Sequence, residues 1–240
     1  MPAPAEAQVC LIIATRNLHK ADEIRAILSR HFQYRTLNDL PGAPPVVEDA
    51  ATFAGNATKK AVTLAEWLAK SAAGAATGVP SFVLADDSGL EVDALDGAPG
   101  VHSARFAALD GTAGAAGQGN SPDAANNAKL LRLLKDILFE KRTARFRCVL
   151  ALTPVLGLEP AGSSPVGSAR GAELQTQLFE GVCEGRIDFA PSGSGGFGYD
   201  PLFVPAGYRQ SFAELGEEVK NQISHRSRAL MKLRERVRAG

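Results

Sequence analysis

Hydrophobic positions in the first half of the chain change between strand-like runs and helix-like spacings. Residues 9–14 (VCLIIA) form a continuous apolar run of strand length. Apolar side chains then recur at helical spacing through Ile24, Ile27 and Leu28. The pattern therefore predicts, in order, a strand over 9–14, a helix through 24–28, a helix over about 52–71, a buried strand over 81–85 and a strand near 90–95.

The second half continues the same mixture of elements. Ser121 offers a side-chain cap and Pro122 fits the first position of a helix, which predicts a helix beginning there. Its apolar face is wide: Leu130, Leu131, Leu133, Leu134, Ile137 and Leu138. Strands are expected over 144–152 and 178–187, and a final helix over 224–238 with four inward residues: Ala229, Leu230, Leu233 and Val237. The predicted fold class is mixed α/β.

Length and composition favour one domain. The chain has 240 residues, of which 45% are hydrophobic, and this is enough for a sizeable core. We interpret residues 1–8 as a loose tail and residues 9–240 as a single domain, which can consist of two lobes. Three stretches rich in Ala, Gly, Ser and Pro are expected to be surface loops: 71–80, 110–120 and 157–171.

Charge and cysteine usage exclude several classes of protein. Lys plus Arg and Asp plus Glu number 26 each, so no net field favours a nucleic-acid backbone or an anionic membrane. No apolar run approaches the roughly 18 to 20 residues that a membrane span needs. Cys10, Cys148 and Cys183 are far apart and lie in apolar segments, which favours buried free thiols. We therefore expect a cytoplasmic protein that binds neither nucleic acid nor membrane.

The first candidate site lies where the first strand leads into the first helix. Thr15, Asn17 and Lys20 stand at this turn, where backbone amides and the helix dipole attract phosphate and lysine adds a full charge. The alternative is an Asn17 helix cap beside a solvated Lys20.

A lysine on the predicted second helix points toward the core. At about 100° per residue, Lys60 falls on the face of Phe53, Ala57 and Leu64, whereas Lys59 points well away. A buried, unpaired ammonium is costly, so Lys60 must either meet an anion or reach solvent along its stem. A phosphate or carboxylate partner is the preferred interpretation.

Acidic residues supply the candidate metal and base groups. Asp86 and Asp87 follow the apolar run FVLA and precede Ser88-Gly89, which suggests the carboxyl end of a buried strand followed by a turn. Because neighbouring residues of an extended chain face opposite ways, one of the two aspartates is expected to face a site. Glu48 precedes the second helix and offers an oxygen ligand of the kind Mg²⁺ prefers. The alternatives are a turn-capping Asp pair and, for Glu48, a helix N-terminal acid, which local sequence favours.

Two further segments could bind a flat ligand. Residues 192–203 (SGSGGFGYDPLF) are rich in glycine, carry Phe197 and Tyr199, and lack the ending of a P-loop, so base stacking suits them better than a phosphate cradle. Lys220, His225 and Arg226 gather donors around the start of the last helix, which would favour a 6-keto over a 6-amino group. A structural turn and a charged helix face are the respective alternatives.

Taken together, these segments resemble the inosine triphosphate pyrophosphatase family, also called the dITP/XTP pyrophosphatases. Five ordered motifs carry the resemblance over most of the chain: ATRNLHKADEI, TFAGNATKKA, ADDSGLEVDALDGAPGVHSARF, SGSGGFGYDPLF and KNQISHRSRAL. The resemblance implies an elongated α/β fold of two lobes with a central nucleotide-binding cleft, and a homodimer. It also implies Mg²⁺-dependent hydrolysis of ITP, dITP and XTP to the monophosphate and pyrophosphate, which keeps these nucleotides out of DNA and RNA.

The resemblance also assigns roles to individual residues. It implies Asp87 as the catalytic base, and Glu48 with Asp87 as the metal ligands. Asp86 is expected to be supporting. The implied substrate-binding residues are Thr15, Arg16, Asn17, Leu18, His19, Lys20, Lys60, Ser88, Phe197, Gly198, Tyr199, Asp200, Lys220, His225 and Arg226.

The chain departs from the family pattern at Gly55, where a glutamate usually precedes the Asn-Ala of the second helix. Two other functions stay open at this point. One is a pyrophosphatase of pyrimidine triphosphates, against which the base-binding motif argues. The other is a non-catalytic nucleotide sensor, which would need the carboxylates to be lost, whereas Glu48 and Asp87 are both present.

Overall fold

The computed structural model describes residues 9–28, 32–71, 78–110, 120–156 and 175–238. The predicted tail over 1–8 lies outside the described residues, as do most of the three loops expected over 71–80, 110–120 and 157–171.

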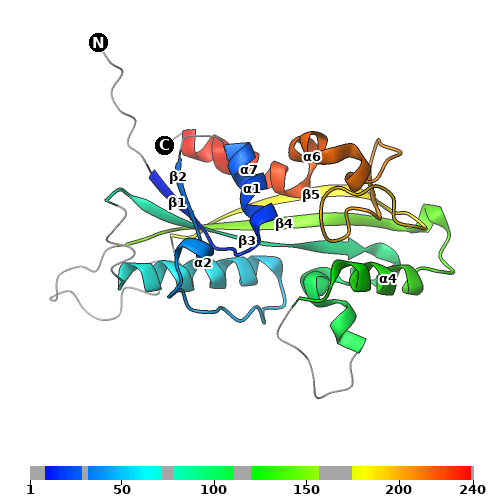
Figure 1. Cartoon of the computed structure of the whole chain (residues 1–240), viewed down its shortest axis with the longest axis horizontal. Helices are drawn as coiled ribbons and strands as arrows, with labels where there is room; N and C mark the ends of the chain where they lie inside the picture. Colours follow the sequence, from blue (N-terminus) through cyan, green and yellow to red (C-terminus); the bar gives the residue numbers. More distant parts are fainter. Residues whose placement is uncertain (1–8, 29–31, 72–77, 111–119, 157–174, 239–240) are drawn as a thin grey trace, which may run out of the picture. The chain divides into compact units, whose positions relative to one another are not determined.

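The strands form a mixed sheet (Figure 1), which confirms the predicted α/β class. Their order across the sheet is β2-β1-β3-β4-β5-β6. Strand β1 pairs in parallel with β2 and β3, whereas β5 and β6 are antiparallel. The bounds are β1 Val9–Ile13, β2 Phe32–Thr36, β3 Ser81–Val92, β4 Thr143–Pro154, β5 Gln177–Ile187 and β6 Phe203–Pro205.

Five α-helices are assigned among the described residues: α1 Leu18–Leu28, α2 Phe53–Ala69, α4 Asp123–Leu133, α6 Phe212–Ile223 and α7 His225–Arg238. Short 3₁₀ turns connect them at Leu37–Asp39, Asp93–Leu95, Gly100–Arg105, Ala107–Asp110 and Phe139–Lys141. None of these described helices has the length and apolar character needed to cross a bilayer.

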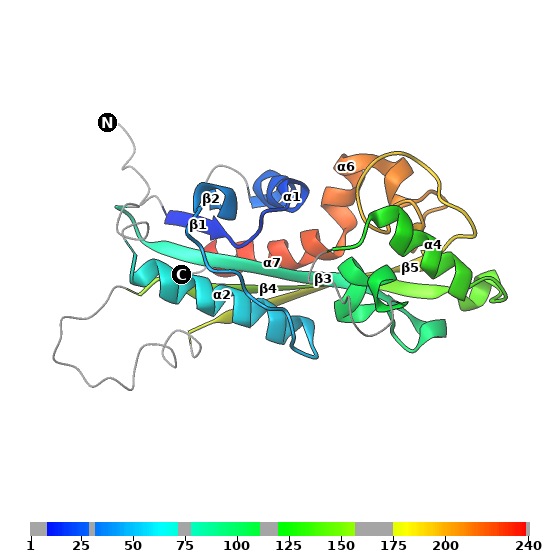
Figure 2. The same ribbon diagram turned by 60° about the horizontal axis from the view of Figure 1, so that its bottom comes forward.

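Strand β1 shows why an unbroken apolar run predicts a buried strand. Cys10 pairs with Gln33 of β2 on one side and with Ser81 of β3 on the other. With both edges hydrogen-bonded and helices α1 and α2 on opposite faces (Figures 1 and 2), both faces of β1 need apolar side chains. Cys10 through Ile13 are accordingly at most 1% exposed.

The chain forms two compact units, and neither is a continuous stretch of sequence. The first unit comprises residues 1–87, 149–179 and 230–240, and the second comprises residues 88–148 and 180–229. The second unit has its own apolar core, in which Phe146, Phe203 and Phe212 pack ring against ring.

Strand β3 differs from the prediction. A strand ending at Ala85, a turn at Ser88-Gly89 and a second strand near 90–95 were expected, but the structure has one strand from Ser81 to Val92. The turn prediction was wrong because the backbone pairing of an inner strand outweighs the local preference of Ser and Gly for turns. Asp86 and Asp87 therefore lie within the strand and not at its end.

Helix α4 begins later and has a narrower apolar face than expected. Pro122, and not Ser121, is the N-cap residue, while the Ser121 hydroxyl accepts a hydrogen bond from Ala108 N. Leu130 and Leu134 are fully buried, whereas Leu133 is 44% and Leu138 is 60% exposed. The helix ends at Leu133, so Leu138 lies beyond the helical face on which the prediction placed it, and Leu133 lies on the exposed side of the helix.

Strands β2 and β6 and helix α6 were not predicted from the sequence, whereas three other elements agree with it. Strands β4 and β5 and helix α7 contain the ranges predicted for them within one or two residues. Ala229, Leu230 and Leu233 are fully buried, as expected, and the side chain of Val237 lies outside the described residues. Cys10, Cys148 and Cys183 are free and buried, which confirms the interpretation of the thiols.

Candidate functional site

The turn between β1 and α1 is stabilised by its own side chains. The Thr15 hydroxyl accepts from Asn17 N at 3.1 Å, and Asn17 Oδ1 accepts from Lys20 N at 3.2 Å. Asn17 therefore caps α1, as the simpler interpretation proposed. The four residues that precede Lys20 are exposed: Arg16, Asn17, Leu18 and His19.

Lys20 is not the solvated lysine of that simpler interpretation. Its Nζ lies 2.5 Å from Asp86 Oδ1, and the two side chains are 22% and 2% exposed. The ammonium group thus extends from the N-terminus of α1 to the middle of β3. A positive charge is held beside a helix N-terminus, where backbone amides already favour an anion.

Helix α2 begins at Phe53, where the Thr52 hydroxyl accepts from Gly55 N and caps the helix. Lys60 lies on its inward face with its side chain 12% exposed, while Lys59 pairs with exposed Asp49. Lys60 Nζ donates to Asp86 O at 2.7 Å and to Glu48 Oε2 at 3.1 Å. The prediction that Lys60 meets an anion is confirmed.

Asp86 and Asp87 alternate in direction, as neighbouring strand residues do. Asp86 binds Lys20, whereas Asp87 lies with Oδ1 3.6 Å from Lys60 Nζ and accepts from Asn56 Nδ2 at 3.1 Å. Both aspartates are buried. The alternative in which the pair caps a turn is wrong, because no turn follows them.

Glu48 is not a helix N-terminal acid, although the local sequence favoured that interpretation. The first turn of α2 contains no acidic residue, and Glu48 precedes Phe53 by five positions. Its carboxylate is instead paired with Lys60, with 39% of the side chain exposed. Glu48 and Asp87 thus share one lysine.

Burial raises the pKa of Asp87 to about 6, and the charge of Glu48 acts in the same direction. The lysine charges and the Asn56 hydrogen bond act in the opposite direction and stabilise the carboxylate. A carboxyl group with a pKa near neutrality can take up and release a proton under physiological conditions. We call the group formed by Lys20, Glu48, Lys60, Asp86 and Asp87 the carboxylate–lysine cluster.

A second cluster lies in the glycine-rich segment before β6. Asp200 is 2% exposed, and its Oδ2 accepts from Phe197 N at 2.9 Å and from Lys220 Nζ at 2.6 Å. Gly196 has a φ of +72°, and a Cβ there would lie 2.2 Å from Asp200 Oδ2. Glycine at this position therefore allows the carboxylate to approach the backbone.

Two cations lie near the Phe197 ring. Lys220 Nζ is 4.4 Å and Arg226 Cζ 5.9 Å from its centroid. Arg226 is 1% exposed, and its Nη2 lies 3.5 Å from Ser88 Oγ. We call Phe197, Asp200, Lys220 and Arg226 the cation–aromatic cluster.

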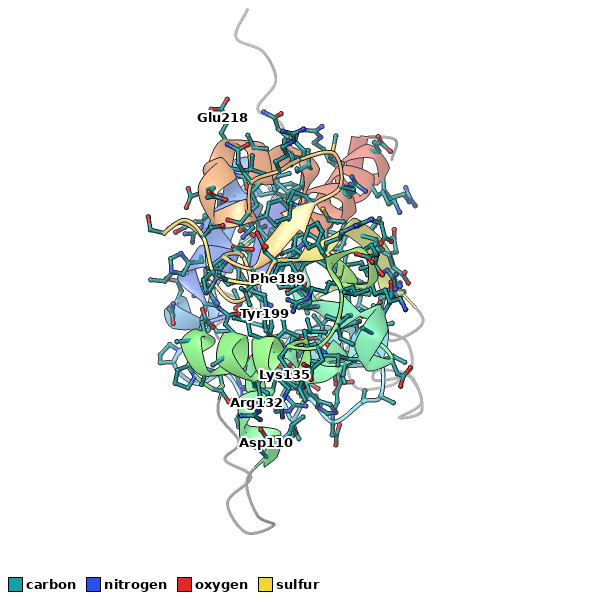
Figure 3. All side chains as sticks on the ribbon, turned by 90° about the vertical axis from the view of Figure 1, so that its right-hand side faces the viewer. Asp110, Arg132, Lys135, Phe189, Tyr199 and Glu218 are labelled. Atoms are coloured by element: carbon teal, nitrogen blue, oxygen red, sulfur yellow. The ribbon has the colours of Figure 1, made fainter. Side chains whose placement is uncertain are left out.

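Tyr199 and His225 lie against the core of the same unit. The Tyr199 hydroxyl donates to Ser103 O at 2.9 Å, and the His225 ring stacks on Phe146 at 4.8 Å between centroids. Exposure differs sharply along helix α6, since Glu218 projects into solvent (Figure 3) whereas Lys220 is 3% exposed.

Three residues that hydrogen-bond to predicted site residues were not identified from the sequence: Asn56, Asp123 and Asn127. Asn56 binds Asp87, while Asp123 and Asn127 hold the peptide of Gly198: Asp123 Oδ2 accepts from Gly198 N and Asn127 Nδ2 donates to Gly198 O. Asn56 precedes Lys60 by four positions, and this spacing was the one available signal that it shares the face of Lys60.

The structure therefore brings the predicted residues together in two groups. Thr15 to Lys20, Glu48, Lys60 and Asp87 belong to the first unit, and Ser88, the segment 197–200, Lys220, His225 and Arg226 belong to the second. Asp87 and Ser88 are consecutive residues of β3, so the backbone itself links the two groups.

Comparison with known proteins gives a consistent assignment. The model of the Ham1 family matches residues 11–236. The chain is 45% identical to a dITP/XTP pyrophosphatase of Desulforamulus reducens, with 94% of each chain covered. It is 46% identical to a dITP/XTP pyrophosphatase of Syntrophobacter fumaroxidans, with 93% of this chain and 79% of the relative covered.

Solved structures support the same assignment. A HAM1 protein from Coxiella burnetii superposes with a TM-score of 0.71 at 32% identity, and 97% of this chain and 100% of that chain are covered. The Ham1 protein of Staphylococcus aureus gives a TM-score of 0.67 at 31% identity, covering 95% and 98% respectively. The resemblance found in the sequence motifs is confirmed, and the chain belongs to the Ham1 family.

Proposed function

We propose that this chain hydrolyses non-standard purine nucleoside triphosphates, namely ITP, dITP and XTP, to the monophosphate and pyrophosphate. The activity agrees with that of its relatives, which are named dITP/XTP pyrophosphatases. Hydrolysis removes these nucleotides from the pool available for DNA and RNA synthesis.

The observation that carries the proposal is the carboxylate–lysine cluster. Lys20 and Lys60 each pair with a carboxylate of the same unit. These carboxylates balance the lysine charges, and the lysines can exchange them for the oxygen atoms of an anionic ligand. A triphosphate can compete for such lysines because it brings several negative charges and strong acceptor oxygens. Lys20, Lys60 and the residues around the start of α1, namely Thr15, Arg16, Asn17, Leu18 and His19, would bind its phosphates.

The donor set fits Mg²⁺. Glu48 and Asp87 approach the same Lys60 ammonium, and carboxylate oxygens are hard donors. Mg²⁺ commonly takes one or two carboxylates together with phosphate oxygens and water. When bound, the ion would offset negative charge at the reacting phosphate.

Asp87 is the proposed general base. Its carboxylate accepts a proton from the attacking water while the water oxygen bonds to the attacked phosphorus and the α–β anhydride bond breaks, which separates the monophosphate from pyrophosphate. The raised pKa of Asp87, caused by burial, suits this task near neutral pH. Lys60 and Lys20 bind charge on the phosphates, and Asp86 supports both lysines through its carboxylate and carbonyl oxygens.

The cation–aromatic cluster is proposed to read the base. Phe197 offers a ring for stacking, and Lys220 and Arg226 donate hydrogen bonds that a 6-keto oxygen can accept and a 6-amino group cannot. His225 and Ser88, with backbone groups of Gly198, Tyr199 and Asp200, complete the proposed contacts. Because Tyr199 is 4% exposed and bound to Ser103, its backbone is better placed for contact than its ring.

Three properties of the whole protein belong to the same proposal. Residues 9–240 would act as one domain, because the segments of the two compact units alternate along the sequence. The protein would be a cytoplasmic homodimer that binds neither nucleic acid nor membranes. Sedimentation velocity with and without nucleotide tests the oligomeric state.

One assay distinguishes the proposal from its alternatives. The protein is incubated with ITP, dITP, XTP, ATP, GTP, dUTP and dCTP, with Mg²⁺ or with EDTA, and all products are separated by ion exchange. Equal amounts of IMP and pyrophosphate from ITP, only with Mg²⁺, are expected. Formation of IDP and phosphate contradicts the reaction, preference for dUTP or dCTP supports a pyrimidine enzyme, and binding without turnover supports a sensor. Hydrolysis in ¹⁸O-labelled water identifies the phosphorus that is attacked.

A further inference from the structure

Asn56 is a buried polar residue in the first turn of α2. It is 1% exposed, and it stands four positions before Lys60, on the same face of the helix. A buried side-chain amide must have its donors and acceptor satisfied, or it destabilises the fold. The partners of Asn56 therefore matter.

Both ends of the Asn56 amide are used. Its Oδ1 accepts from Ala50 N at 2.9 Å, and its Nδ2 donates to Asp87 Oδ2 at 3.1 Å. The orientation of the amide is fixed by these partners, because a backbone N–H can only donate and a carboxylate can only accept. One side chain thus joins helix α2, strand β3 and the segment that contains Glu48.

The segment around Ala50 is held tightly against the start of α2. A Cβ added at Gly55 would lie 2.8 Å from the Ala50 Cβ, so glycine permits this approach. Lys59 also pairs with Asp49 at 2.6 Å. Gly55, which departs from the family pattern, therefore has a structural reason here: it lets the Glu48 segment lie close to Asn56.

Asn56 also limits the contact between Asp87 and Lys60. Lys60 Nζ lies 2.7 Å from Asp86 O and 3.1 Å from Glu48, but 3.6 Å from Asp87 Oδ1. A carboxylate free to rotate beside an ammonium would shorten that contact, since the attraction grows as the distance falls. The hydrogen bond from Asn56 holds the other oxygen of Asp87.

We propose that Asn56 is a positioning residue, which fixes the direction of the Asp87 carboxylate and, through Ala50, the position of the segment that carries Glu48. Its catalytic consequence rests on the proposed function, whereas its effect on cation binding does not require turnover. A positioning residue of this kind contacts neither the reacting water nor the phosphates. Asn56 acts through Asp87 and Glu48.

Asn126 offers a matched control in the other unit. It is also an asparagine in a helix, 3% exposed, whose Oδ1 accepts from a backbone amide, that of Ala107, at 2.8 Å. Its Nδ2 donates to Ala104 O at 3.3 Å, a carbonyl and not a carboxylate. Asn56→Ala and Asn126→Ala therefore remove similar buried hydrogen bonds, and only the first removes a contact with Asp87.

The first experiment compares kcat and KM for ITP in the two variants, at a temperature where circular dichroism shows both to be folded. For Asn56→Ala, kcat is expected to fall about 10- to 100-fold, as for a reacting group displaced by about 1 Å, with KM changed by less than about threefold. Asn126→Ala is expected to keep kcat within about threefold. Equal losses of kcat in the two variants would overturn the proposal.

Asn56→Asp separates the two hydrogen bonds of Asn56. Aspartate keeps an acceptor for Ala50 N but cannot donate to Asp87 when ionised. A kcat as low as that of Asn56→Ala is expected if the bond to Asp87 matters. A return to the wild-type kcat would contradict the role assigned to that bond.

A second readout needs no turnover. Binding of Mn²⁺ alone is measured by the relaxation of water protons. The affinity is expected to weaken about tenfold in Asn56→Ala and to stay unchanged in Asn126→Ala, because loss of a residue that hydrogen-bonds to a metal ligand commonly lowers metal affinity by about 10- to 100-fold. Unchanged Mn²⁺ binding together with an unchanged kcat refutes the inference. If wild-type protein releases no pyrophosphate from ITP, the proposed function fails, and the Mn²⁺ comparison still decides the role of Asn56.

Discussion

The two clusters of candidate site residues hold their charges in different ways. In the carboxylate–lysine cluster, Lys20 and Glu48 keep 22% and 39% of their side chains exposed, and Lys60 is shared among several oxygen atoms. In the cation–aromatic cluster, the Lys220 and Asp200 side chains are 4% and 2% exposed and form one short ion pair. The first is a set of exchangeable contacts, and the second is a fixed set of donors beside a ring.

This difference suits two tasks. A group that binds a polyphosphate must release its resting carboxylate partners when the phosphate oxygens arrive, so contacts that can be exchanged are useful. A group that distinguishes one base edge from another must keep its donors in place, because discrimination depends on leaving the wrong partner unsatisfied. We expect the carboxylate–lysine cluster to control the rate and the cation–aromatic cluster to control the choice of base.

The largest effect is expected from Asp87→Asn. Loss of the proposed base and metal ligand should lower kcat for ITP by about 10³-fold or more, with a smaller change in nucleotide affinity. Stopped-time pyrophosphate assays and calorimetric binding of ITP measure the two quantities. Asp49→Asn, which removes an exposed carboxylate paired with Lys59, is the control and should keep the wild-type rate. Near wild-type turnover by Asp87→Asn would disprove the assignment.

The next effect concerns selectivity. Arg226→Met keeps the length of the side chain but removes the donors, so kcat/KM for ITP should fall about 10²-fold while kcat/KM for ATP changes little. Arg228→Met is the matched control, because Arg228 stands on the same helix, is exposed and donates to Val182 O. An equal loss for ITP and ATP would mean that Arg226 supports the fold and does not read the base.

Phe197→Ala should have a smaller effect, which falls mainly on KM. Loss of base stacking is expected to raise KM about tenfold or more for all purine triphosphates, with kcat changed less. Phe189→Ala, which removes a 57% exposed ring from the same unit, should leave KM unchanged. A fall in kcat at constant KM would place Phe197 outside the base-binding group.

The smallest effect is one on stability without metal. Because burial raises the pKa of Asp87 from 3.8 to about 6, its ionised carboxylate destabilises the folded state; this cost begins above the unfolded pKa and is complete above the folded one, whereas at pH 3 the group is mostly protonated whether the chain is folded or not. Asp87→Asn should therefore raise the free energy of unfolding by about 2 kcal/mol at pH 8 and by almost nothing at about pH 3. Urea unfolding in EDTA at the two pH values measures this, and a gain that is equal at both would refute the role of ionisation.

Much of the fold followed from local patterns. The apolar run of β1 was sufficient to place that strand, because a strand buried on both faces has apolar residues at every position. The helical spacing that turns Lys60 inward was sufficient to place α2, because apolar residues recur with a period of about 3.6 residues on the buried face of a helix. The continuity of β3 through Ser88-Gly89 was not predictable in this way. It depends on pairing with neighbouring strands, which local turn preference does not reveal.

The candidate site shows the same contrast between what local sequence reveals and what depends on distant contacts. Residue types identified Lys60, Asp87 and Phe197 as candidates, but their partners lie far along the chain. Asn56 binds Asp87 across 31 residues and Asp123 binds Gly198 across 75, so neither contact could be found from spacing. The local sequence favoured Glu48 as a helix N-terminal acid, because acidic residues are common near the start of a helix. The structure shows instead that Glu48 accepts a hydrogen bond from Lys60.

The ratio of kcat/KM for ITP to that for ATP in the wild-type protein, measured as pyrophosphate release with Mg²⁺, tests the central claim most directly. The account predicts a ratio of about 10² or more, because the buried cations Lys220 and Arg226 can donate to a 6-keto group and not to a 6-amino group. A ratio near one would contradict the account, since it would show that the cation–aromatic cluster does not select the base.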